Sequence, residues 1–124
     1  MARRDLTGAV DFAYLEAYAA HDQGVVDEVL GLFREQAALW MRLLDPQADG
    51  EGWRDAAHSL KGSARSIGAG ALADACAAAE VSGADQMARA ARLGEVRDAL
   101  DLALADIAAY LHEQALRSLK GPAI

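Results

Sequence analysis

Apolar residues recur along much of the chain at spacings of three and four, the period of one buried face of an α-helix. The clearest series consists of Val26, Leu30, Phe33, Ala37, Trp40 and Leu44. Asp22 is a suitable N-cap before this series. Asp45-Pro46 ends the helix, because the residue before a proline is pushed out of the helical region. A shorter helix is predicted before it, over residues 11–19.

The second half of the chain continues this pattern. A loop is expected over 46–52, a third helix over 53–67 and a fourth over 70–81. The last helix is long, with Asp85 as its candidate cap, and its apolar positions are Leu93, Val96, Leu100, Leu104, Ile107 and Leu111. Gly94 lies within this series, and the pattern leaves open whether the helix is continuous there.

Four amphipathic helices joined by short turns, preceded by a short helix, predict an all-α fold. The expected architecture is an antiparallel four-helix bundle with a short additional N-terminal helix. The composition agrees, because 53% of the residues are hydrophobic, only 6% are aromatic and there are only two prolines. At 124 residues, the chain is expected to form a single domain over 1–124 with a core of its own.

The charge of the chain excludes several classes of function. A net charge of −7 argues against binding nucleic acid or an anionic membrane surface, since both need a basic footprint. No apolar stretch approaches the roughly 20 residues needed to span a bilayer. The single cysteine, Cys76, excludes an internal disulfide, and we find no export signal at the N-terminus. We therefore expect a cytoplasmic protein.

The predicted helix over 53–67 has two distinct faces when successive residues are placed about 100° apart. Its core face contains Trp53, Ala57, Leu60, Ala64 and Ile67. A second arc contains Arg54, His58, Lys61 and Arg65, and Gly62 lies beside this arc. His58 is therefore expected on the solvent side, in a row of three cations on a chain that is acidic overall.

This row of cations suggests that the helix handles an anion, since like charges at helical spacing otherwise destabilise it. The same cations are expected to disfavour imidazolium and so to favour the neutral, nucleophilic form of His58. A phosphoryl group on the ring would be met by Lys61 and by Arg65, and Gly62 would leave open space beside the imidazole. Such a site can carry a phosphoryl group, but it lacks the parts needed to cleave a nucleotide.

The same region carries a family signature. The run His58-Ser59-Leu60-Lys61-Gly62-Ser63-Ala64, then Ile67-Gly68-Ala69, then Leu72, Cys76 and Glu80, resembles the signature of histidine-containing phosphotransfer (HPt) domains of two-component phosphorelays. The match is close over 57–80 and looser over the helices before it. The chain departs from the family at Ala78 and Ala79, where larger apolar residues are common, and at Arg65, a position that the family varies.

The resemblance implies a phosphohistidine at His58, stabilised by Lys61, that exchanges its phosphoryl group with aspartates of receiver domains. The expected partners are response regulators and a hybrid histidine kinase, and the docking face would include Gly62, Arg65 and Arg54. The chain would need no cofactor or metal of its own, because the receiver domain supplies Mg²⁺. It would act as a monomeric carrier without ATP-binding or autokinase activity.

Three other interpretations remain. His58 could be an ordinary surface histidine, or the chain could be an interaction module with the HPt fold that binds its partner without phosphotransfer. A di-metal carboxylate bundle would need inward Glu-x-x-His pairs, and the only comparable pair, Asp55-x-x-His58, faces outward. His21 and His112 have no partner at ligand spacing. The sequence leaves open which residue orients the His58 ring.

Overall fold

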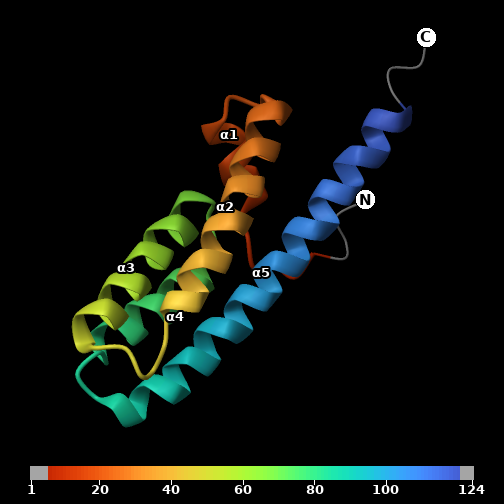
Figure 1. The fold of residues 1–124 in the computed structure, drawn as a ribbon. Coiled ribbons are helices and arrows are strands. Elements are labelled where there is room, and N and C mark those ends of the chain that lie inside the picture. Colours follow the sequence, from red (N-terminus) through yellow and green to blue (C-terminus); the bar gives the residue numbers. More distant parts are fainter. Residues whose placement is uncertain (1–5, 121–124) are drawn as a thin grey trace.

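The computed structural model describes residues 6–120, which form five helices and no strand (Figure 1). The helices are α1 (Phe12–Tyr18), α2 (Gln23–Leu43), α3 (Gly50–Ser66), α4 (Gly70–Val81) and α5 (Gln86–Lys120). Helices α2 to α5 form the bundle, α1 lies beside the start of α2, and α5 extends well beyond α3 and α4 (Figure 1). The predicted all-α bundle with a short leading helix is confirmed.

Helix α3, which carries the candidate histidine, begins earlier than its sequence pattern predicts. The expected loop over 46–52 is wrong in its last three residues, because α3 already begins at Gly50. Asp49 causes the early start: its side chain accepts a hydrogen bond from the backbone N–H of Gly52 at 2.6 Å. This N-cap satisfies a free donor of the first turn and compensates for its poor helix formers.

The turn between α3 and α4 depends on Gly68, whose φ of +76° lies in the left-handed region that favours glycine. A Cβ at this position would come within 3.1 Å of Asp11 Cβ and 3.2 Å of the Asp11 carbonyl oxygen. The Asp11 backbone N–H donates a hydrogen bond to the Gly68 carbonyl at 3.0 Å. The segment before α1 is thereby attached to the end of α3.

Helix α5 is continuous through Gly94, which resolves the question that the pattern left open. Asp85 accepts hydrogen bonds from the backbone N–H groups of Met87 and Ala88, as its predicted role as cap requires. Of the six predicted apolar positions, Val96, Leu100 and Ile107 are buried and the other three are partly buried. The sequence pattern missed four further buried residues of this helix, Arg89, Ala103, Asp106 and Tyr110.

A buried arginine joins the two loops at one end of the bundle. Arg89 is only 6% exposed, and its guanidinium lies over the ring of Trp53, 5.7 Å from the centroid. It donates to the carbonyl oxygens of Gly83, Pro46 and Ala48. Because these carbonyls belong to the α2–α3 loop and the α4–α5 turn, Arg89 holds the start of α3 in place.

Candidate functional site

The face of α3 that carries His58 points to solvent, as the helical arrangement predicts. The five residues assigned to the core face, Trp53, Ala57, Leu60, Ala64 and Ile67, are all fully buried. The His58 side chain, by contrast, is 67% exposed. The histidine is therefore accessible to a partner while the helix that carries it is firmly packed.

A carboxylate from α4 connects the two candidate residues of α3. Glu80 Oε2 lies 3.0 Å from His58 Nδ1, and Glu80 Oε1 accepts a hydrogen bond from Lys61 Nζ at 2.7 Å. We call these three residues the α3–α4 cluster. Glu80 belongs to the family signature, but its role was not predicted, because 22 residues separate it from His58 and only the packing of α3 on α4 brings them together.

The contact with Glu80 defines the state of the histidine ring. A carboxylate can only accept a hydrogen bond, so the nitrogen that faces it, His58 Nδ1, carries a proton. In the neutral ring the lone pair then resides on Nε2, the other ring nitrogen. Glu80 is the residue that orients the His58 ring, which the sequence alone did not identify.

Glu80 is held in its charged form. The hydrogen bond from Lys61 is the main cause that lowers the pKa of this carboxyl below its ordinary value of 4.5. Partial desolvation acts in the opposite direction, and the hydrogen bond from His58 adds to the lowering. At neutral pH the cluster therefore contains a carboxylate between two nitrogen donors.

His58 has an acidic neighbour that the predicted row of three cations did not include. Its nearest charged neighbour is the Glu80 carboxylate, and Lys61 is paired with the same group. Arg54 packs its aliphatic part toward the α4–α5 turn, where a Cβ at Gly83 would come within 2.6 Å of Arg54 Cγ. Arg65 is exposed and lines a separate pocket of about 270 Å³ with Tyr14 and the α3–α4 turn. A helical wheel of one helix could not show these neighbours, because they come from other elements.

Gly62 is one turn away from His58 and is exposed. A Cβ built at this position would meet no atom within 4 Å. The fold therefore does not require a glycine here, and the predicted open space beside the imidazole is present.

An apolar stripe on α2 extends this accessible face, and the sequence analysis did not single it out. It consists of the exposed side chains of Val25, Leu32, Leu39 and Leu43, which we call the α2 stripe. Gln36 shares this face of α2 because its spacing to Leu32 and Leu39 is helical. Gln36 Oε1 accepts a hydrogen bond from Ser63 Oγ at 3.3 Å, next to Gly62. The spacing of seven from residue 25 to 32 to 39 was the available signal.

The remaining chemical candidates play no part in this cluster. Cys76 is fully buried, and burial raises the pKa of its thiol to about 12, so it packs as a small apolar side chain. The side chains of His21 and His112 are exposed and make no hydrogen bond or ion pair with other described residues. Within residues 6–120, no three His, Cys, Asp or Glu side chains are grouped to hold a metal ion. Every helix of this part is too short or too polar to cross a bilayer.

The fold and the site together define a helical-bundle protein in which a carboxylate of α4 contacts an exposed histidine of α3. The Hpt domain family matches residues 25–117. The chain therefore belongs to the Hpt domain family and is a histidine phosphotransfer protein of phosphorelay signalling. Proteins of this family interact with receiver domains of phosphorelay components.

Solved structures show the same relationship. Histidine phosphotransferase ShpA from Caulobacter crescentus is 57% identical over 90% of this chain and 99% of that chain, with a TM-score of 0.72. A protein from rice, assigned to the histidine-containing phosphotransfer proteins, shares the fold with a TM-score of 0.74. It is 23% identical over 89% of this chain and 86% of its own. The comparison with curated proteins finds no match.

Proposed function

We propose that this protein carries the phosphoryl group on Nε2 of His58 and relays it between receiver aspartates. The observation that supports this most directly is the contact between Glu80 and His58 Nδ1, at 3.0 Å. It assigns the ring proton to Nδ1 and leaves the lone pair of the neutral ring on Nε2, on a side chain that is 67% exposed.

In the transfer step, the Nε2 lone pair attacks the phosphorus of an aspartyl phosphate on the receiver domain. A nitrogen–phosphorus bond forms while the bond from phosphorus to the aspartate oxygen breaks, and the aspartate leaves as a carboxylate. The ring keeps its Nδ1 proton and becomes positively charged, next to the negative charge of Glu80. The reverse step returns the phosphoryl group to another receiver aspartate.

Lys61 and Glu80 have different parts in this step. Lys61 Nζ has three donors, of which one is used by Glu80 at 2.7 Å, so the others are free to contact phosphoryl oxygens. Glu80 is a positioning residue, because it orients both the ring and the ammonium group. Mg²⁺ on the receiver domain would neutralise further charge on the transferred group, and this chain would supply no cofactor of its own.

The receiver domain would dock on the face that contains Gly62, Arg65 and the α2 stripe. Gly62 lets the partner approach the ring closely, and the apolar stripe offers area that loses water on binding. Arg54 lies toward the α4–α5 turn and would contribute at the margin of this face. We propose receiver domains of response regulators and of a hybrid histidine kinase as partners, and a monomeric carrier that works in the cytoplasm.

The test is transfer of radiolabelled phosphoryl groups from a phosphorylated receiver domain, comparing the wild type with His58→Gln. His21→Gln is the matched control, because His21 is also an exposed histidine. We expect acid-labile, base-stable label on the wild type and on His21→Gln, and none on His58→Gln. Label that persists in folded His58→Gln would contradict the assignment. A folded wild type that takes no label but still binds the receiver would favour a phosphate-independent interaction module.

A further inference from the structure

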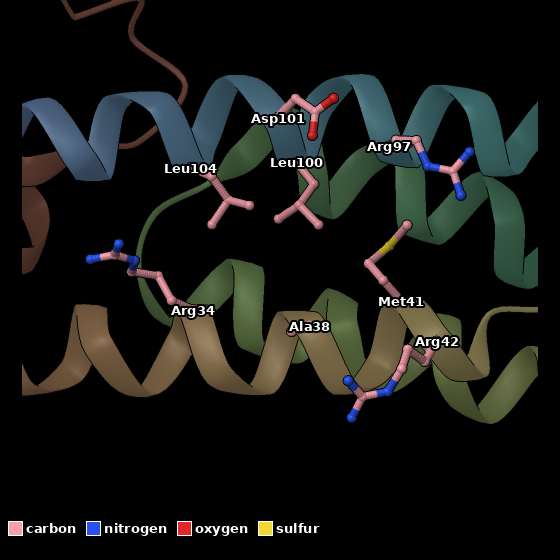
Figure 2. A pocket seen from close by; sticks show the side chains of 8 residues that line it. All are labelled: Arg34, Ala38, Met41, Arg42, Arg97, Leu100, Asp101 and Leu104. Atoms are coloured by element: carbon pink, nitrogen blue, oxygen red, sulfur yellow. The ribbon is translucent and has the colours of Figure 1, made fainter.

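The structure contains a second surface whose chemistry phosphotransfer does not use. Helices α2 and α5 run antiparallel with few direct contacts, and a groove of about 410 Å³ lies between them (Figure 2). Met41 from α2 and Leu100 and Leu104 from α5 point into this groove (Figure 2). Its lining comes from α2 and α5, whereas the α3–α4 cluster is built from the other two bundle helices.

Three arginines surround this apolar floor: Arg34, Arg42 and Arg97, which we call the groove arginines. Arg34 stands toward the Leu104 end, and the other two stand toward the Met41 end (Figure 2). Among the described residues, Asp101 is the only acidic one that lines the groove. On a chain with a net charge of −7, this is a local excess of positive charge.

The groove arginines are exposed and make no hydrogen bond or ion pair with any other described residue. A guanidinium group has five donors in a planar fork that matches a carboxylate. The chain contains 19 acidic residues, and Asp101 lines the same groove, but none of the described acidic residues forms an ion pair with these arginines. The groove is therefore complementary in charge to an acidic ligand.

The shape of the groove limits the classes of ligand that can bind there. From Arg34 to Arg42, α2 rises about 12 Å, which corresponds to roughly two turns of a helix. The polar groups stand at the exposed rim and do not converge inside, in contrast to most small-molecule sites. An apolar floor between two antiparallel helices, with a basic rim, suits an amphipathic helix with acidic flanks.

We propose that the α2–α5 groove is a second docking site, which binds an acidic amphipathic helical segment of a partner protein. Apolar side chains of that segment would cover Met41, Leu100 and Leu104, and its carboxylates would pair with the groove arginines. Because the α3–α4 cluster is built from different helices, a partner held in the groove would leave His58 free for a receiver domain. The protein would then act as an adaptor as well as a carrier.

The test uses the full chain and a fluorescein-labelled peptide designed as a helix, with leucines on one face and glutamates on both flanks. Fluorescence anisotropy should show saturable binding, and amide chemical shifts should change along α2 and α5. Arg34→Glu with Arg97→Glu should weaken binding at least about tenfold. Arg117→Glu, an exposed arginine elsewhere on α5, is the matched control and should stay within about twofold.

A second variant tests the groove itself instead of its charge. Ala38 lines the groove and is exposed, so Ala38→Trp should fill the space without unfolding the protein. We expect this variant to lose the peptide while its circular dichroism and its phosphorylation on His58 remain unchanged. His58→Gln should still bind the peptide, so that failure of the docking site and failure of phosphotransfer can be distinguished.

Four outcomes would overturn the docking site. These are no saturable binding, equal binding of a scrambled peptide of the same composition, equal weakening by Arg117→Glu, or no effect of Ala38→Trp. Vesicles of phosphatidylglycerol and phosphatidylcholine that bind with the same arginine dependence would assign the groove to a membrane surface. Self-association that the arginine variants abolish would assign it to a second copy of this chain. Either of these results would replace our proposal.

Discussion

The α3–α4 cluster and the α2–α5 groove both place basic side chains on the surface of an acidic protein, but only the first pairs them. In the cluster, one carboxylate contacts both His58 and Lys61 at hydrogen-bond distance. In the groove, three arginines surround an apolar floor without a partner among the described residues. Paired groups have a defined position, as chemistry on a small group requires, whereas unpaired groups keep their donors for a binding partner.

A third basic residue, Arg89, is buried and has more hydrogen-bond partners than Lys61 or the groove arginines. Arg89→Met should lower the free energy of unfolding by about 3 kcal/mol, because three carbonyl groups lose their donor and a planar cation over Trp53 is removed. Arg34→Met, in the groove, should change it by less than about 0.5 kcal/mol. Urea unfolding of both variants measures the difference. Similar values for the two would mean that the pairing of Arg89 contributes little.

Removing the shared carboxylate should break the cluster without unfolding the protein. Glu80→Ala should slow phosphotransfer by about 100-fold, because neither the ring nor Lys61 would be held in position. Glu80→Gln should recover much of this loss, since its amide oxygen still accepts the Nδ1 proton of His58. Single-turnover transfer from a phosphorylated receiver measures both rates. If Gln and Ala were equally slow, the negative charge and not the orientation would be the property that matters.

Filling the open space beside the ring should separate stability from activity. Gly62→Gln should raise helix stability by about 0.5–1 kcal/mol, because no atom lies within 4 Å of the new Cβ and glycine is a poor helix former. The same change should slow transfer about tenfold by obstructing the receiver domain. Gly94→Gln is the matched control, since it also meets nothing within 4 Å but lies on α5. Equal transfer rates for the two variants would contradict the proposal that the receiver domain docks over Gly62.

The smallest expected effect is the dependence of stability on pH through Glu80. Its pKa is lowered in the folded protein, so its stabilising contribution is present above the ordinary value of 4.5 and is lost as pH falls through the lowered value. Because the side chain is 27% exposed, this contribution should stay below about 1 kcal/mol. The stability difference between the wild type and Glu80→Gln should therefore shrink from neutral pH to about pH 3. A stability difference that increased as the pH was lowered would contradict the predicted direction of this effect.

The amino-acid sequence determined the features that depend on a short stretch of chain. The buried face of α3 and the exposure of His58 follow from the helical period, because neighbours three and four residues apart are set by local geometry. The family signature over 57–80 identified His58 as the candidate phosphorylation site, because all of its residues lie within one short stretch of the sequence. The all-α fold followed from uninterrupted apolar periods and the scarcity of proline.

Only the tertiary structure decided which helices meet. The contact from Glu80 to His58 joins residues 22 apart, and the groove joins Arg34 to Arg97, so no local period could reveal either. The start of α3 at Gly50 depended on the Asp49 cap, which outweighed two poor helix formers. Gly94 did not interrupt α5, since a glycine in a helix costs only about 1 kcal/mol and the packing of the neighbouring turns is worth more.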